Sequence, residues 1–356
     1  MTETERPHLA GLPADRLEAL VVAAGQPGYR ARQLARWVFK EGCFAPEAMS
    51  DLPAGFREWL AAHVDAGRLR LLQRREARDG TRKYLFGHRD GTLESVLMPY
   101  GEGLDGPDRV TACISTQVGC AVGCAFCATG LAGFQRNVTA GDMVEQVLRM
   151  QAEAGHRITN VVFMGMGEPF LNYDETLAAV HLLNKSVGIG MRHLTLSTSG
   201  IVPGIRRLAA ERLQLTLAIS IHAPDDALRD RLVPINRKYP LADLREAMVD
   251  YFEQTGRRLS VEYVLLDDVN DHPDQARALS RWIGDLPVHV NLIPFNATDT
   301  VFRTSPPARV RQFREVLEAA GHPATVRRER GAEIDGACGQ LRRRYEEGQP
   351  VESGKA

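Results

Sequence analysis

The sequence has few of the features that mark a secreted, membrane-spanning or disordered chain. Its 356 residues include six cysteines and three tryptophans, and aromatic residues make up 6% of the total. Six cysteines are too few for a disulfide scaffold in a chain of this length. No apolar run approaches the roughly 18 residues that a membrane helix needs, and the first residues lack the basic-then-apolar order of a signal peptide. We therefore expect a cytoplasmic protein that is not bound to a membrane.

The chain also lacks an excess of charge of either sign. Its 44 Lys and Arg are balanced by 45 Asp and Glu, and this near-neutral total argues weakly against a nucleic-acid partner. The average conceals three basic stretches, which are 28–40, 68–83 and 327–344. Within the first, Arg32, Arg36 and Lys40 recur every four residues and form one stripe on a predicted helix. That stripe is either a solvated helix face or a surface that meets RNA.

Alternating apolar segments predict an α/β fold from about residue 108. The predicted strands are 110–115, 160–164, 194–198, 215–221, 261–266 and 288–293. The helical patterns between them are 142–154, 175–183, 205–211, 241–253 and 274–282. Apolar strands separated by helices are typical of a parallel sheet covered by helices. Six such units are too few for a closed eight-fold barrel, and they favour an open, partial one.

Four parts are expected along the chain. The predicted boundaries are a helical domain at 1–65, a basic linker with a β-hairpin at 66–107, a barrel core at 108–325 and a C-terminal segment at 326–356. The hairpin is predicted from strand-like residues 83–87 and 93–98, which flank the turn-forming pair Asp90-Gly91.

Polar and glycine-rich segments follow each predicted strand of the barrel. They are the cysteines 120–127, then 165–169, 197–200, 220–223, 267–268 and 294–296. In α/β barrels the carboxyl ends of the strands carry the active site. Six such segments in succession are hard to explain by packing, so this end of the barrel is the predicted site.

Three cysteines form the most specific motif. Cys120, Cys124 and Cys127 have the spacing C-x3-C-x2-C, and Gly119 and Gly123 allow the backbone to curl around a common ligand. A closed structural zinc site needs four protein ligands, and there is no second cysteine pair. Three thiolates can instead hold a [4Fe-4S] cluster and leave one iron open. The spacing favours iron–sulfur over zinc, with a chance group of buried thiols as a third possibility.

These motifs resemble those of radical S-adenosylmethionine (SAM) enzymes, in which the open iron chelates SAM. The resemblance is closer to one branch, the adenosine methyltransferases of 23S ribosomal RNA that comprise RlmN, which modifies carbon 2, and Cfr, which modifies carbon 8. The matching segments are 115–120, 127–137, 165–169, 197–200, 220–224, 233–237, 294–296 and 330–340. Together with the helical N-terminus they cover nearly the whole chain.

The resemblance implies a partial (β/α)6 radical SAM barrel with a small N-terminal helical accessory domain that binds RNA, and a C-terminal extension. It implies methylation of carbon 2 of adenosine 2503 in 23S rRNA before ribosome assembly is complete, and of adenosine 37 in some tRNAs. Two SAM molecules and an electron donor such as flavodoxin would be needed, and we expect a monomer. Carbon-8 methylation, a radical SAM enzyme acting on a peptide or small molecule, and a non-catalytic iron–sulfur RNA-binding regulator remain alternatives.

The resemblance also implies roles for three further residues. Cys338 matches the thiol that is methylated by a first SAM, and a radical from a second SAM then activates that methyl group for addition to adenine. Cys113 matches the resolving thiol, which forms a transient disulfide with Cys338. Glu94 matches the base that removes a proton from the adduct. Without the resemblance, a cysteine such as Cys113 is more often a small buried hydrophobe, and Glu94 a solvated side chain.

Further residues match the SAM contacts of the family. They are Gly167, Glu168, Ser199, Ser220, Ile221, His222, Ala223 and Asn296. The segment 100–108 is longer than expected between Glu94 and the first barrel strand. Basic residues near Cys338 serve either solubility or phosphate binding; they are Arg327, Arg328, Arg330 and 342–344.

Overall fold

The computed structural model describes residues 6–88, 91–101, 107–296, 300–327 and 334. Cys338 therefore lies outside the described residues, as do Arg328, Arg330 and the basic segment 342–344. None of the described helices is long and apolar enough to span a bilayer.

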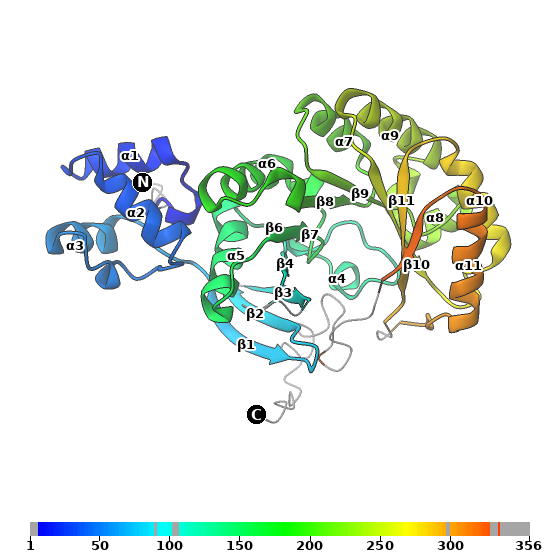
Figure 1. The fold of residues 1–356 in the computed structure, drawn as a ribbon, viewed down its shortest axis with the longest axis horizontal. Coiled ribbons are helices and arrows are strands. Elements are labelled where there is room, and N and C mark those ends of the chain that lie inside the picture. The colour runs from blue at the N-terminus through cyan, green and yellow to red at the C-terminus, as the bar shows by residue number, and fades with distance from the viewer. Residues whose placement is uncertain (1–5, 89–90, 102–106, 297–299, 328–333, 335–356) are drawn as a thin grey trace.

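A small helical unit precedes the sheet. Its helices are α1 (Ala14–Ala23), α2 (Arg30–Phe39) and α3 (Ala54–His63), and they project to one side of the barrel (Figure 1). The predicted helix in 28–40 is confirmed by α2, whose residues Leu34 and Val38 are fully buried. These two side chains lie four residues apart and therefore share the face that packs into the core of the unit.

Ten strands form one open sheet, in the order β1-β2-β3-β4-β7-β8-β9-β10-β11-β12. From β4 onward all neighbours are parallel. These parallel strands are β4 (Arg109–Cys113), β7 (Asn160–Phe163), β8 (Leu194–Thr198), β9 (Thr216–Ser220), β10 (Leu259–Leu265), β11 (Val288–Pro294) and β12 (Ala324–Val326). The predicted open barrel is confirmed. The seventh parallel strand, β12, was not predicted, because three residues are too few for a periodic pattern.

The antiparallel part of the sheet is larger than predicted. The expected hairpin is present as β2 (Arg82–His88) and β3 (Gly91–Tyr100). The stretch before it, interpreted as a basic linker, contributes a further strand, β1 (Arg70–Glu76), at the edge of the sheet. Its charged side chains and the register shift between Leu71 and Gln73 suit an edge strand, because both discourage pairing with another chain. The charged side chains of β1 therefore hid this strand from the sequence pattern.

Helices cover the outer face of the parallel strands (Figure 1). They are α5 (Ala140–Ala154), α6 (Tyr173–Leu182), α7 (Val202–Ala210), α9 (Leu241–Thr255), α10 (Pro273–Ile283) and α11 (Pro307–Ala319). The first begins with a capping box, in which Thr139 and Asp142 exchange both hydrogen bonds. Two shorter helices, α4 (Ala128–Leu131) and α8 (Asp226–Leu232), lie near the carboxyl ends of the strands.

Candidate active site at the carboxyl ends of the parallel strands

The segment after β7 packs tightly against the segment that leaves β4. The amide groups of Thr116 and Gln117 both donate to the carbonyl of Met166, at 2.8 and 3.2 Å. Gly167 has a φ of +104°, and a Cβ at this position would lie 2.7 Å from the backbone nitrogen of Gln117. Only glycine fits this close approach. The glycine thus brings the expected SAM-binding segment beside the chain that leads to the cysteines.

Glu168 is buried and its carboxylate is fixed by neighbouring groups. One oxygen accepts from the backbone N–H and the hydroxyl of Ser199, at 2.7 and 2.8 Å, and the other accepts from the N–H of Phe170. Burial raises the pKa of Glu168, and the hydrogen bonds from residues 198–199 and Phe170 oppose this effect. These contacts join the ends of β7 and β8, where two of the predicted site segments meet.

The cysteine loop crosses from β4 to the far side of the barrel mouth. The N–H of Cys127 donates to the carbonyl of Cys124 at 3.1 Å, and the N–H of Ala125 donates to Leu232 at the end of α8. Cys120 and Cys124 pack on an apolar cluster that includes Val264 and residues near the ends of β9, β10 and β11. The loop is therefore held against strands that are remote from it in sequence.

The three thiols form an electrostatically strained group. Burial raises the pKa of Cys120 to about 12, and negative charge at Cys127 and Glu168 contributes to the increase. Burial and the charges of both other cysteines also raise the pKa of Cys124 well above its usual value. A cationic metal centre would relieve this repulsion, since coordination deprotonates thiols.

The spacing of the sulfurs indicates which kind of centre fits. Zinc holds thiolates at about 2.3 Å, which places sulfur atoms roughly 4 Å apart around one ion. Among the described residues, the groups with all ligand atoms within 4.8 Å of one another contain His8, Asp142 and Glu145, or Asp268, Asp271 and His272. The three cysteines are described and belong to neither group. The sulfurs of these three cysteines are therefore not all within the spacing that a single ion allows, which disfavours zinc.

His222 lies two residues beyond the end of β9 and has an unusual backbone conformation. Its φ is +61°, and its Nδ1 accepts a hydrogen bond of 3.0 Å from the N–H of Val264. Asn270 donates to its carbonyl, and the edge of its ring meets Phe126 in the cysteine loop. Burial and the nearby charge of Arg229 lower its pKa to about 3. The imidazole is therefore neutral, and its proton is on Nε2.

The other expected SAM contacts lie along the same edge. Ser199 follows β8, Ser220 ends β9, and Ile221 and Ala223 are fully buried. Asn296 lies two residues beyond the end of β11 and is half-buried. All of these positions are at carboxyl ends of parallel strands, as the sequence predicts.

Glu94 and Cys113 share the inner face of the sheet. Val96 on β3 is paired with Cys113 on β4, and Glu94 is two residues from Val96, so their side chains are on one face. The buried Nζ of Lys83 lies 3.2 Å from a carboxylate oxygen of Glu94. Lys83 was not identified from the sequence, because a lysine in a basic stretch is usually exposed.

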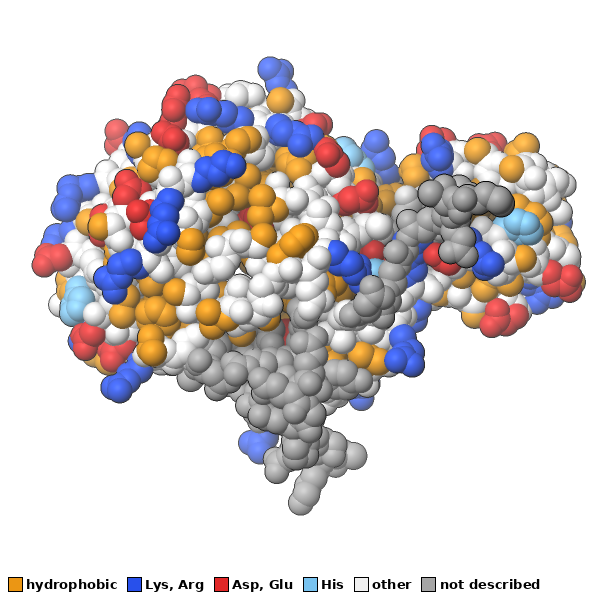
Figure 2. Space-filling view, turned by 180° about the vertical axis from the view of Figure 1, so that it is seen from behind, with side chains coloured by type: hydrophobic (Ala, Val, Ile, Leu, Met, Phe, Trp, Pro, Cys, Tyr) orange, Lys and Arg blue, Asp and Glu red, His pale blue; other side chains and the backbone are white. Residues whose placement is uncertain are grey.

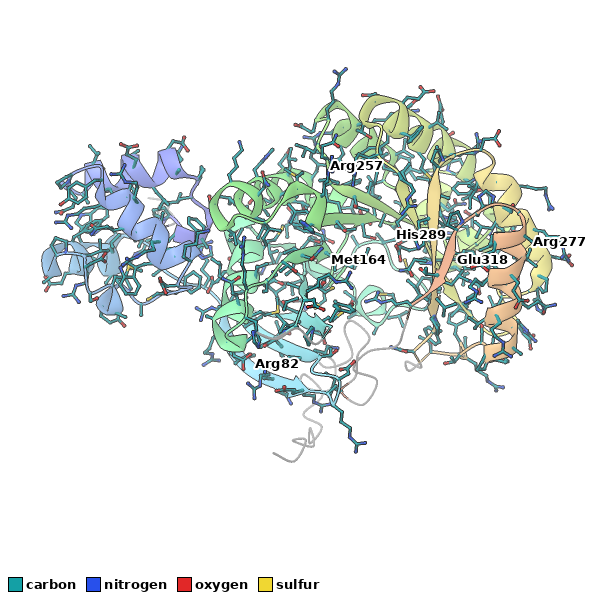
Figure 3. The ribbon with its side chains drawn as sticks, viewed as in Figure 1. Arg82, Met164, Arg257, Arg277, His289 and Glu318 are labelled. Carbon is teal, nitrogen blue, oxygen red and sulfur yellow. The ribbon has the colours of Figure 1, made fainter. Side chains whose placement is uncertain are left out.

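That face borders a cavity of about 330 Å³ inside the barrel. Met98 and Thr111 line it from β3 and β4, and Glu262 and Asn291 line it from β10 and β11. Met164, at the end of β7, points into the same space (Figure 3). Glu94 and Cys113 are not among the residues that line this cavity, which include Asn160 and Thr216 at the starts of β7 and β9. The cavity therefore lies mainly toward the amino ends of the parallel strands.

The described basic residues outside the barrel mouth are largely engaged. Arg36 pairs with Asp51 at 3.0 Å, and Lys40 donates to the carbonyl of Val187. Arg74 and Arg82 both pair with Glu153 on α5. Figure 2 shows Lys and Arg interspersed with Asp and Glu on the face it presents, without one continuous basic surface. The local positive charge of 68–83 is thus partly neutralised by tertiary contacts.

Known families and relatives match nearly the whole chain. The model of the radical SAM superfamily matches residues 114–279, and that of the ribosomal RNA large subunit methyltransferase N-terminal domain matches residues 8–65. A curated relative from Symbiobacterium thermophilum, "Probable dual-specificity RNA methyltransferase RlmN", is 47% identical over 96% of this chain and 93% of its own length. The chain belongs to the RlmN family.

Other members of the RlmN family match over similar lengths. A relative of the same name from Moorella thermoacetica is 48% identical over 95% of this chain and 98% of its own. The crystal structure of a radical SAM methyltransferase from Sphaerobacter thermophilus superposes with a TM-score of 0.89 and 46% identity, covering 94% of this chain and 98% of that one. These matches include both the helical unit and the barrel.

Proposed function

We propose that this protein is a radical SAM methyltransferase that acts on carbon 2 of adenosine in RNA, with adenosine 2503 of 23S rRNA and adenosine 37 of some tRNAs as substrates. The observation that supports this reaction is that the loop with the three cysteines lies beside the strand ends that hold Glu168 and His222. RNA as the substrate is supported by the names of relatives with 47% and 48% identity over nearly the whole chain.

Cys120, Cys124 and Cys127 would hold a [4Fe-4S] cluster, which supplies, when bound, the electron for reductive cleavage of SAM. The residues expected to hold SAM are Gly167, Glu168, Ser199, Ser220, Ile221, His222, Ala223 and Asn296. Glu168, which already accepts bonds from Ser199, suits the amino group of SAM, because an ionised carboxylate is an acceptor only.

Three side chains would handle the methyl group and the proton. Cys338 is assigned as the methyl carrier. The thiolate of Cys113 then attacks the sulfur of Cys338, so that an S–S bond forms as the bond from sulfur to the methylated base breaks. A two-electron reductant restores both thiols. Glu94 takes the proton from the adduct carbon, and its position on the face that also carries Cys113 supports this role.

The helical unit would contribute RNA binding, since its residues match an N-terminal domain of ribosomal RNA methyltransferases. The target adenine would have to leave its stack to reach the barrel mouth. We propose that the protein acts as a monomer and that an electron carrier such as flavodoxin reduces it.

The test is anaerobic reconstitution of the cluster, followed by incubation with reductant, methyl-labelled SAM and either a 23S rRNA fragment or tRNA. Mass spectrometry of the nucleosides should find 2-methyladenosine. Cys338→Ala should give none, whereas Cys43→Ala, which changes a cysteine of the helical unit, should give the wild-type yield. If 8-methyladenosine is the product, the carbon-8 alternative is correct. If no methyladenosine forms with wild type, the proposed function is wrong.

A further inference from the structure

Arg229, on α8, is fully buried at the mouth of the barrel. Its Nη2 donates to the carbonyls of Ser199 and Ser220, at 2.6 and 3.1 Å, and its Nε donates to the carbonyl of Ile221 at 3.1 Å. One guanidinium therefore holds the ends of β8 and β9. Residues at these two ends are among those proposed to bind SAM.

The charge of Arg229 is kept separate from its counter-ions. Its Nη1 donates to the side-chain oxygen of Asn236 at 2.7 Å, and the amide nitrogen of Asn236 donates to Asp226 and Asp230 at 2.9 and 2.6 Å. The amide thus lies between the cation and two carboxylates, and negative charge at Cys124 as well as at Asp226 and Asp230 favours the charged form of Arg229. Burial lowers the pKa of Arg229 to about 10, so the group stays charged at neutral pH.

Gly200 is shaped to admit this guanidinium. Its φ is +105°, and a Cβ at this position would lie 3.2 Å from Nη2 of Arg229 and 3.0 Å from a methyl carbon of Leu244. A side chain here would press on the arginine and strain the backbone. The glycine that follows Ser199 in the sequence therefore serves the approach of Arg229.

We propose that Arg229 is a positioning residue for SAM. By binding three carbonyl groups at the ends of β8 and β9, Arg229 sets the distance between these two strand ends. This inference rests on the proposed function in taking SAM as the ligand. Arginine suits the task because its planar donors reach several acceptors in fixed directions, whereas lysine offers one flexible charge. Arg229 touches neither the reacting atoms nor, by this proposal, SAM itself.

The test measures SAM binding without RNA. Reconstituted wild type, Arg229→Lys and Arg229→Gln are titrated with SAM, and binding is followed by the change in the EPR spectrum of the reduced cluster. We expect iron content to stay at the wild-type level, because the three cysteines are intact. We expect the dissociation constant for SAM to rise about tenfold or more in both variants, because small displacements of positioning groups have effects of this size.

Leu279→Ala is the control for lost stability. Leu279 is fully buried on α10, so its truncation lowers the melting temperature through a cavity, and its SAM affinity should equal that of wild type. Gly200→Ala is a second probe that keeps the arginine, and it should also weaken SAM binding. Wild-type affinity in Arg229→Lys or in Gly200→Ala would overturn the proposal. A wild type that binds SAM but methylates no RNA contradicts the proposed function and leaves these affinities interpretable.

Discussion

Two buried ionic networks of this protein differ in how their charges are balanced. The first, the seam cluster, consists of His8, His88, Asp142 and Glu145 and joins the helical unit to α5 and β2. The imidazole nitrogens of His8 lie 3.5 Å from Asp142 and 3.0 Å from Glu145, and a nitrogen of His88 lies 3.2 Å from Asp142. In the seam cluster, imidazole rings face carboxylates directly.

The second network is at the strand ends, where charged groups meet mostly neutral dipoles. Arg229 binds carbonyl groups and an amide, and Glu168 accepts from N–H and hydroxyl groups. The imidazole of His222 is neutral and accepts from the backbone N–H of Val264, and the side-chain amide of Asn270 donates to the carbonyl of His222.

The difference indicates two purposes. Directly paired charges stabilise a junction, but their contribution depends on pH. Charges held by dipoles leave an oriented site, in which His222 stays neutral and Arg229 stays charged near neutral pH. Variants at both networks test this difference.

The largest effect is expected from Cys124→Ala, at the strand-end site. Loss of one proposed cluster ligand should abolish iron binding and reduce methylation at least about a thousandfold. The effect is this large because residues that act together in one catalytic group lose most of their joint activity when one of them is removed. Iron analysis and the nucleoside assay measure both. Retained iron with full activity would exclude Cys124 as a ligand.

Lys83→Met tests a direct pair on the inner face of the barrel. Glu94 would keep a buried charge without this partner, so the free energy of unfolding should fall by about 3 to 5 kcal/mol, measured by urea denaturation. The double variant Lys83→Met/Glu94→Leu should recover most of this loss. If the double variant is no more stable than the single one, the pair is not the cause.

Asp142→Asn tests the seam cluster. Burial would raise the pKa of Asp142, but the hydrogen bond and charge of His88, with contributions from Thr139 and His8, lower it below the usual range. The ionised group therefore stabilises the fold above its unfolded pKa of about 3.9, and this contribution is lost as pH falls below that value.

The variant should lose about 2 to 3 kcal/mol at neutral pH, and the difference from wild type should shrink on acidification. Denaturation at several pH values measures this, with SAM affinity as the control that should not change. A constant difference at all pH values would contradict the pairing.

His222→Asn tests the constant protonation of the strand-end site. The pKa of His222 is lowered to about 3, so the side chain does not change charge above pH 5. Asparagine tolerates the positive φ. The ratio of the SAM affinities of wild type and variant should therefore stay constant between about pH 5.5 and 8. A ratio that changes near pH 6.5 would show that His222 titrates there.

The smallest effects are expected at the surface of α2. Arg36 is paired with Asp51, and Arg32 is exposed. Arg36→Gln should change stability by less than about 1 kcal/mol. If the stripe meets RNA, Arg32→Gln should weaken RNA binding about twofold to threefold and lower its salt dependence, because one phosphate contact is lost. Unchanged binding and salt dependence would indicate a solvated face.

Much of the fold could be predicted because its signals are local. The apolar strands 194–198 and 288–293 appear within a residue of their predicted bounds, and α5 contains the predicted helix 142–154. The edge strand β1 was missed because its side chains are charged, and β12 because it is short. Arg229 and Lys83 were missed because long basic side chains are rarely buried.

The order of strands and helices, the spacing of three cysteines and the placement of polar segments after each strand were determined by the sequence itself. Each depends on residues that are close together along the chain. Only the tertiary structure decided which groups the charged side chains pair with. Within 68–83, Arg74 and Arg82 pair with Glu153 on α5 and Lys83 pairs with Glu94 on β3, and Arg229 binds strand ends up to 30 residues away. Such pairings depend on desolvation and distance after folding, which local sequence patterns do not encode.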